Sequence, residues 1–230
     1  MRYGIIGAMD IEIEMLLAEL TETRTVTRAG MTFHEGKVGD TEAVIVRCGI
    51  GKVNAGICVQ ILADLFNVDC VINTGIAGSL SNRLDIGDIV ISTDAIQHDM
   101  DVTKLGYVPG EIPQIGVVSF AADPKLRTRA VKACRKAAPD INVMEGRITT
   151  GDQFIASMDR KREIIEVFGG LCTEMEGAAI AQAAYLNDLP YVIVRAISDK
   201  ADDSGAMSYA QFEKKAAMHC SGLVLQMLKS

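Results

Sequence analysis

The chain has 230 residues, of which 49% are hydrophobic and 23% are charged, and its formal net charge is −7. A chain of this length can bury a sizeable core, so we expect one domain over residues 1–230. The acidic balance argues against nucleic acid as a partner, because neutralising phosphates requires clustered Lys and Arg.

Targeting, redox and metal signals are weak. No segment approaches the roughly 20 apolar residues of a membrane-spanning helix, and residues 1–15 lack the long apolar run of a signal peptide. The six cysteines form no C-x-x-C pair, which indicates reduced, buried side chains. The three histidines have no metal-ligand spacing. We therefore expect a cytoplasmic protein without a metal and without membrane contact.

Strand-like and helix-like segments alternate from the N-terminus. An apolar run at residues 3–9 leads into a segment whose apolar residues recur at helical spacing. Strand-like residues at 32–39 and 42–49 predict a hairpin around Asp40 and Thr41. Residues 53–66 have the pattern of a buried helix.

The alternation continues to the C-terminus. Strands are predicted at 70–75, 88–97, 143–151 and 191–199, and helices at 124–138, 161–170, 176–188 and from about 209 to 228. The first of these strands is expected to end in the glycine-rich segment TGIAGSL, residues 74–80. The pattern predicts an α/β domain with a mainly parallel central sheet flanked by helices on both faces.

Ligands in such sheets bind beyond the carboxyl ends of the strands. Five segments at predicted strand ends therefore carry the candidate chemistry: IIGAMDIE, TGIAGS, TGDQF, TEMEG and RAISD. TGIAGS lacks the lysine of a phosphate-binding P-loop and the spacing of a dinucleotide fingerprint.

Several charged residues in these segments each allow two interpretations. Glu12 either compensates a helix dipole or acts as a general base. Asp199 either caps a turn or, with Ser198, hands a proton to a substrate at the strand exit. Arg195 is a buried ion-pair partner or a substrate contact. Glu174 and Glu176 both lie at the start of a predicted helix, where they compensate its dipole or offer a carboxylate to the hydroxyls of a ribose.

Two further residues are ambiguous. Phe154 follows a polar turn and is either a core residue or a lid over an aromatic base. His98 reads as a hydrogen-bonded loop residue rather than a catalyst. Spacing alone thus indicates an α/β enzyme with a carboxylate-rich site and goes no further.

The ordered motifs then show a family resemblance. GIIGAM with Glu12, GIGKVNA, INTGIAGSL, GDIVIS, HDMDVT, TGDQFI, TEMEGAAIA and VRAISDKAD together resemble the 5′-methylthioadenosine/S-adenosylhomocysteine nucleosidases of the purine nucleoside phosphorylase superfamily. The resemblance covers essentially the whole chain. It implies a single α/β domain around a mixed central sheet, a homodimer, no cofactor, and a role in methionine salvage.

The resemblance also implies roles for five polar residues. Asp199 would be the general acid that protonates N7 of adenine, with Ser198 holding it. Glu12 would be the general base that activates water, and Arg195 would order Glu12 and the water. Glu176 would accept hydrogen bonds from the ribose. For Asp199 to act as an acid near neutral pH, its pKa must be raised.

The remaining site residues bind the base and the 5′-group. Phe154 would stack on the purine while the backbone of Ile155 reads the adenine edge, and Glu174, Ala77 and Gly78 complete the substrate-binding set. The 5′-pocket would be apolar, with two members, Val102 and Leu105, supplied by the other subunit. Its predicted lining is Met9, Ile50, Val102, Leu105, Met175 and Tyr209.

Three residues depart from the family pattern. Ile76 stands where many relatives carry Ser, Leu105 where an aromatic residue is frequent, and Tyr209 where Phe is frequent. These changes leave open the preference between methylthioadenosine and S-adenosylhomocysteine. A nucleoside phosphorylase, a futalosine-type hydrolase and a non-catalytic nucleoside-binding protein remain as alternatives, although the last does not require both an acid and a base.

Overall fold

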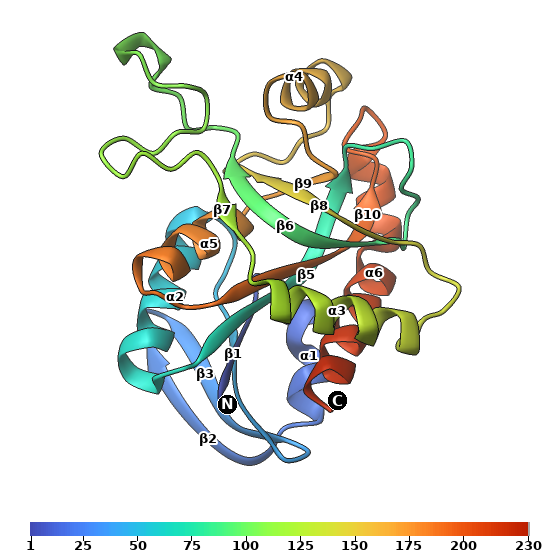
Figure 1. The fold of residues 1–230 in the computed structure, drawn as a ribbon. Coiled ribbons are helices and arrows are strands. Elements are labelled where there is room, and N and C mark those ends of the chain that lie inside the picture. The colour runs from blue at the N-terminus through green and yellow to red at the C-terminus, as the bar shows by residue number, and fades with distance from the viewer. Residues whose placement is uncertain (230) are drawn as a thin grey trace.

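The computed structural model describes residues 1–229 and has an α/β architecture (Figure 1). The strands, in chain order, are β1 (Tyr3–Gly7), β2 (Thr21–Arg28), β3 (Met31–Val38), β4 (Thr41–Arg47), β5 (Cys70–Ser79), β6 (Ile89–Gln97), β7 (Phe120–Ala121), β8 (Val143–Thr150), β9 (Cys172–Glu174) and β10 (Tyr191–Asp199). The helices are α1 (Asp10–Ala18), α2 (Lys52–Phe66), α3 (Pro124–Ala137), α4 (Met158–Phe168), α5 (Gly177–Leu186) and α6 (Gly205–Leu228), with one 3-10 turn, η1 (Thr103–Leu105).

The strands form one mixed sheet around β5. This strand pairs in parallel with β1 and β10 and antiparallel with β9. From β10 the sheet continues through β6 and β8 to β9 and so returns to β5, which closes five strands into a ring. On the other side of β1, strands β4, β3 and β2 extend the sheet outward. The expected α/β class, with a mixed sheet flanked by helices, is confirmed.

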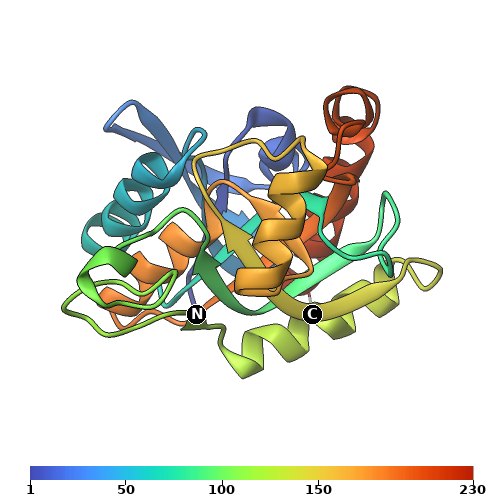
Figure 2. The same ribbon diagram turned by 90° about the horizontal axis from the view of Figure 1, so that it is seen from above.

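Helices cover both faces of this sheet (Figures 1 and 2). On one face α2 and α5 bury Leu62 and Ile180 against the strands, and on the other α1, α3 and α6 bury Leu16 and Val224. Helix α4 lies over one end of the ring, where its Ile164 belongs to a smaller apolar cluster. Burial on both faces explains why the central strands have continuous apolar sequences.

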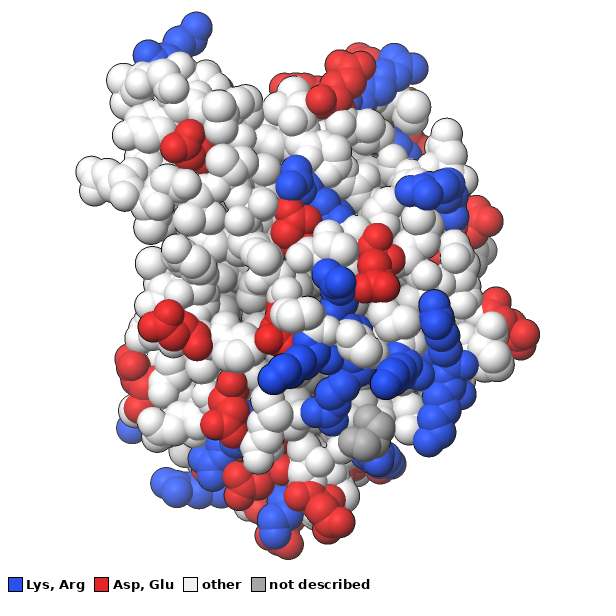
Figure 3. Space-filling view, in the orientation of Figure 1, with Lys and Arg blue, Asp and Glu red and all other residues white. Residues whose placement is uncertain are grey.

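Helix α3 shows how charge is kept on the outside. Its Leu126, Ala130 and Ala133 are buried, and four of its basic side chains are exposed: Lys125, Lys132, Arg135 and Lys136. Lys and Arg atoms gather over α3 in the space-filling view (Figure 3). This basic cluster lies in a chain of net charge −7.

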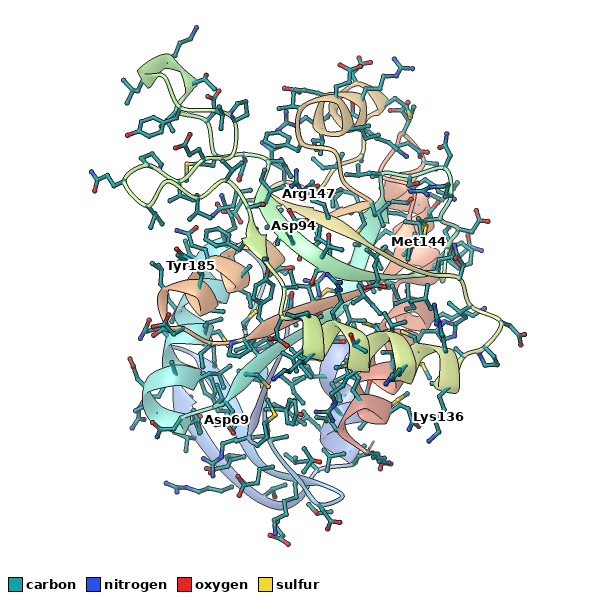
Figure 4. The ribbon with its side chains drawn as sticks, viewed as in Figure 1. Asp69, Asp94, Lys136, Met144, Arg147 and Tyr185 are labelled. Carbon is teal, nitrogen blue, oxygen red and sulfur yellow. The ribbon has the colours of Figure 1, made fainter. Side chains whose placement is uncertain are left out.

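The ring is also joined by charged side chains. Arg147 of β8 points toward Asp94 of β6 (Figure 4), and two of its guanidinium nitrogens donate to one Asp94 oxygen at 2.9 and 2.7 Å. A third donates to the Phe168 carbonyl at the end of α4. Between β6 and β7 a long loop carrying η1 projects from the body of the protein (Figure 1).

Three local predictions differ from the structure. The glycine-rich segment 74–80 was expected beyond the end of a strand, but β5 continues through it to Ser79. The last helix begins at Gly205 rather than near Tyr209. Strand β2 was not predicted, because nearly all its side chains are exposed and it has no apolar alternation. Within residues 1–229, no helix is long and apolar enough to cross a membrane.

Candidate active site

A cavity opens where β1, β5, β9 and β10 end, as expected for the carboxyl ends of strands in an α/β sheet. Its volume is about 460 Å³, including its open mouth. It is lined by Ala8, Met9, Glu12, Ile50, Ile76, Ala77, Gly78, Phe154, Thr173, Glu174, Met175, Glu176, Ser198, Asp199 and Tyr209.

Glu12 is buried in the first turn of α1, and backbone donors hold its carboxylate. One oxygen accepts from the amides of Ala8 and Met9 at 2.7 and 3.0 Å, and the other accepts from the amide of Ile76 at 3.1 Å. Burial raises the pKa of Glu12, although the nearby charge of Arg195 and these amides act in the opposite direction. The side chain is therefore fixed in position, and its raised pKa makes it a stronger base than an ordinary glutamate.

Arg195 is a fully buried cation behind this carboxylate. It donates to Asn73 at 2.5 Å and to the carboxylate of Glu174. Burial alone would lower the pKa of Arg195, but the adjacent carboxylates of Glu174 and Glu12 outweigh it and raise the pKa. Arg195 therefore stays charged and balances several buried acids, so the ion-pair interpretation of this residue holds.

Gly75 explains how Glu12 and Arg195 meet inside β5. A Cβ atom on Gly75 would lie 2.5 Å from Glu12 Oε1 and 2.9 Å from Arg195 Nη1, and both separations are too short for any side chain. The glycines of the segment therefore belong inside the strand. They let side chains from β10 and α1 cross β5 at close range.

Glu174 and Glu176 have different surroundings although both border the cavity. Glu174 accepts hydrogen bonds from Arg195, from the Thr150 hydroxyl and from the amides of Glu176 and Gly177. Its carboxylate is thus held by the protein, and its direct contact with a substrate stays a prediction.

Within residues 1–229, the carboxylate of Glu176 instead accepts one hydrogen bond, from the amide of Gly51 at 2.8 Å. Burial, with the neighbouring charge of Glu174, raises the pKa of Glu176 to about 8. The carboxyl group therefore retains capacity for further hydrogen bonds. This is what an acceptor for two sugar hydroxyls requires.

Asp199 ends β10 and is 2% exposed. One carboxylate oxygen accepts from the amide of Ala201 at 2.8 Å, and the other accepts from the Ser198 hydroxyl at 2.9 Å. Burial raises the pKa of Asp199, while these two donors limit the rise. The condition set for a general acid, a raised pKa, is met.

Gly78 places Asp199 relative to Glu12. A Cβ atom on Gly78 would lie 2.8 Å from Asp199 Oδ1, so the acid crosses β5 at this position. Gly75 and Gly78 are three residues apart on one strand, which corresponds to roughly 10 Å. The two carboxyl groups thus reach one cavity from points far enough apart to leave room for a substrate between them.

The remaining wall of the cavity is apolar and open. Phe154 is 50% exposed and Ile50 is 54% exposed. The Phe154 ring makes an edge contact with Tyr209 at 5.6 Å, and the Tyr209 hydroxyl lies 3.3 Å from the sulfur of Met9. Phe154 is therefore at the surface of the site and not in the core, in line with its interpretation as a lid.

Four predicted residues do not line the cavity of this chain. Arg195 lies behind it, and the Ile155 side chain packs into the cluster beneath α4. Val102 and Leu105 lie at η1 on the projecting loop, where Leu105 is 77% exposed. Their supply by another subunit stays a prediction.

The structure adds three lining residues that were not assigned roles: Ala8, Ile76 and Thr173. Ala8 and Ile76 contribute backbone amides to Glu12, which side-chain patterns do not reveal. Thr173 is the first residue of TEMEG, a segment already selected, but its threonine type gave no signal of its own. Within residues 1–229, no group of three or more His, Cys, Asp or Glu is placed to hold a metal ion.

Comparison with known proteins agrees with this geometry. The sequence profile described as the phosphorylase superfamily matches residues 2–229. A 5′-methylthioadenosine/S-adenosylhomocysteine nucleosidase from Exiguobacterium is 41% identical over all of this chain and 98% of its own. The chain belongs to this family of nucleosidases, within the phosphorylase superfamily.

Solved structures support the family assignment. The Neisseria meningitidis nucleosidase in complex with methylthio-immucillin-A has a TM-score of 0.96 and 38% identity, covering 99% of this chain and 98% of its own. Futalosine hydrolase of Helicobacter pylori has a TM-score of 0.94 and 30% identity, covering 99% and 97%. The resemblance seen in the sequence motifs is confirmed, and the second structure shows that proteins of this fold include a futalosine hydrolase as well as nucleosidases.

Proposed function

We propose that this protein hydrolyses the N-glycosidic bond of 5′-methylthioadenosine and S-adenosylhomocysteine, and also of 5′-deoxyadenosine. The products are adenine and the corresponding 5-substituted ribose. The observation that carries the proposal is one cavity bordered by two buried carboxyl groups, Glu12 and Asp199, whose pKa values are both raised. The similarity to nucleosidases along the whole chain selects the substrate class.

The acid step belongs to Asp199. Its protonated carboxyl group transfers a proton to N7 of adenine, and the electron pair of the breaking C1′–N9 bond leaves with the base. The hydroxyl of Ser198 donates to Asp199 and stabilises the carboxylate that remains. Protonation makes adenine a far better leaving group, so this step lowers the barrier directly.

The base step belongs to Glu12. Bond cleavage leaves positive charge on the ribose, which nearby carboxylates stabilise. Glu12 takes a proton from a water molecule while the oxygen of that water molecule bonds to C1′. Three amides fix Glu12, and the charge of Arg195 lies close behind it, so the base is held ready before the substrate arrives.

The other groups orient the nucleoside. Glu176 accepts from the ribose hydroxyls, and Phe154 covers the purine, with the backbone of Ile155 at its edge. Ala77 and Gly78 leave space for the substrate along β5. Met9, Ile50, Met175 and Tyr209 form the apolar side that receives the 5′-thio group.

A homodimer would complete this pocket. The residues proposed to come from the partner lie on a loop that also exposes Val108. Helix α2, which follows Ile50 in the chain, exposes Val53 at 72% and Ile57 at 42%. Large apolar side chains gathered on one subunit support a protein interface. A cytoplasmic location and a place in methionine salvage stay predictions.

Water, not phosphate, is the proposed nucleophile. No Lys or Arg lines the cavity within residues 1–229, and Ile76 provides an apolar side chain there. A phosphorylase needs cationic groups to hold its phosphate. The composition of the cavity therefore favours hydrolysis over phosphorolysis.

The test is to incubate the protein with 5′-methylthioadenosine, with and without phosphate, and to identify the products by chromatography and mass spectrometry. Adenine and free methylthioribose in both conditions are expected. A sugar 1-phosphate that forms only with phosphate would make the protein a phosphorylase. No adenine at all would contradict the proposal, and a futalosine-type nucleoside would be the next substrate to test.

A further inference from the structure

Thr173 carries a hydroxyl group that the protein leaves unused. It lies in β9, is 5% exposed and borders the cavity. Its Oγ1 atom is buried and has no hydrogen-bond partner among residues 1–229. The adjacent strand differs, because the hydroxyl of Thr149 donates to a backbone carbonyl and that of Thr150 to Glu174. An unpaired buried hydroxyl is unfavourable in the free protein, so it points to a ligand that pairs with it.

Strand register puts this hydroxyl in line with the general acid. Thr173 pairs with Gly78 of β5 on one side, and Asp199 of β10 pairs with the same glycine on the other. The two residues are thus two strand spacings apart, about 10 Å between backbones. The register of β10 against β5 shifts just before this pair, between Ile197 and Asp199. Gly78 has no side chain, and the Asp199 carboxyl group and the Ala201 methyl group fill the space where one would stand, at 2.8 and 2.9 Å from the position of a Cβ atom. The acid therefore reaches over Gly78 toward the strand that carries Thr173.

The other contacts around Asp199 orient a base that lies against this row of residues. A Cβ atom on Gly205 would lie 3.5 Å from Asp199 Oδ1 and 3.7 Å from the Ile155 carbonyl oxygen, so the acid and this backbone segment meet at one end of the row. Thr173 stands at the other end, three residues before Glu176. With N7 and the amino group of adenine toward Asp199 and Ile155, the edge next to the ribose faces Thr173.

We propose that the Thr173 hydroxyl donates a hydrogen bond to N3 of the bound adenine and makes this chain select bases with an acceptor at that position. N3 is the ring nitrogen on the edge beside the glycosidic bond, close to the ribose that Glu176 holds. The inference rests on the proposed function for the orientation of the nucleoside. It adds a specificity-determining contact to that function.

The test combines a variant with a modified substrate. Thr173→Val removes the hydroxyl at nearly constant shape, and 3-deaza-5′-methylthioadenosine replaces N3 by a carbon. We expect either change alone to lower kcat/KM by about 10-fold, the effect of one lost hydrogen bond. Together they should cost no more than the substrate change alone, because both remove the same bond.

Thr149→Val is the matched control. Thr149 is the direct neighbour of Thr173 on β8, but its hydroxyl is already bonded to the Cys172 carbonyl at 3.2 Å and it does not line the cavity. This variant should lower the melting temperature and leave the 3-deaza effect unchanged. Thr173→Val should keep the melting temperature or raise it, because it removes an unpaired buried hydroxyl.

Binding measurements distinguish a failure of the Thr173 contact from a failure of the proposed function. Calorimetry with adenine and 3-deazaadenine needs no turnover, and we expect Thr173→Val to abolish the difference in affinity between them. If the variant keeps the wild-type preference, or if the two changes multiply, the Thr173 contact is overturned. Failure of the proposed function itself is recognised differently, by the absence of adenine release from methylthioadenosine by the wild-type protein.

Discussion

The two walls of the cavity are built in opposite ways. On the polar wall, Glu12 and Glu174 are buried and held by several donors each, and Arg195 lies between them. On the apolar wall, Phe154 and Ile50 are about half exposed. Glu12, Glu174 and Arg195 are paired without a substrate, whereas the apolar wall has surface still to be covered.

This difference separates chemistry from specificity. Groups that stabilise charge act best when they are fixed before the reaction, because they then need no reorganisation. Groups that enclose a thioether or a base gain from burial when the ligand arrives. Changes in the polar wall should therefore lower kcat, and changes in the apolar wall should mainly raise KM.

The largest effect is expected for Asp199→Asn. The variant cannot donate the proton that adenine needs, so kcat should fall by about 10²- to 10⁴-fold, the usual contribution of a general acid. Asparagine still accepts from the Ala201 amide, so the fold should be kept. Steady-state kinetics, with a melting curve for each protein, checks this. An Asn variant with wild-type turnover would remove Asp199 from the mechanism.

Glu12→Gln should be nearly as severe and should alter the pH profile. Glu12 acts as a base only when ionised, so its raised pKa makes the activity of the wild type rise with pH through that pKa. Asp199 acts only when protonated, so activity falls as pH rises through its own raised pKa. The profile of kcat/KM should be bell-shaped, and the rising limb should vanish in Glu12→Gln. A rising limb that survives would show that another group is the base.

A smaller effect is expected on the apolar wall. Phe154→Ala removes the ring over the proposed base site, so KM should rise by about 10-fold, the loss of one aromatic stacking contact. The change in kcat should be smaller. Tyr209→Phe is the matched control, because it removes the hydroxyl near Met9 and keeps the ring that contacts Phe154. A large fall in kcat with unchanged KM would contradict the division between the two walls.

The smallest effect is on stability. Because the pKa of Glu176 is raised to about 8, its carboxyl group favours the folded state at low pH, and this contribution is lost as pH rises from about 4.5 to 8. Glu176→Gln removes that loss. Without ligand, the variant should therefore have a higher melting temperature than the wild type at pH 8 and the same melting temperature at pH 4.5. One kcal/mol corresponds to about 2–4 °C in a chain of this size. A melting difference that does not vary with pH would contradict the assignment.

The sequence predicted the central strands and most helices, and it selected Glu12 and Asp199, which both border the cavity. Continuous apolar segments ending in acids, such as the one that ends at Asp199, identify strands and their functional ends together. The exposed strand β2 was missed because pairing at a sheet edge, not burial, defines it. The glycine-rich segment was misplaced because β5 needs glycine where side chains from α1 and β10 approach it closely. A local sequence pattern does not show such approaches.

Long-range pairing explains what else the sequence did not show. The closing of the ring through β9 depends on three residues whose neighbours come from β5 and β8. The same pairing puts Thr173 opposite Gly78, and it brings Glu174 to Arg195. Family resemblance supplied roles for other residues of the motif TEMEG, but it supplied none for the Thr173 hydroxyl, because only the fold shows that this hydroxyl lacks a partner within residues 1–229.

The central claim is that Asp199 acts by protonating the leaving base, and a leaving group that needs no proton tests it most directly. The substrate is a 4-nitrophenyl riboside with a 5-methylthio group, which departs as a stable phenolate. We predict that Asp199→Asn loses at least about 100-fold in kcat on methylthioadenosine but stays within about threefold of the wild type on the nitrophenyl substrate. Equal losses on both substrates would contradict the account, because Asp199 would then serve something other than the departure of the base.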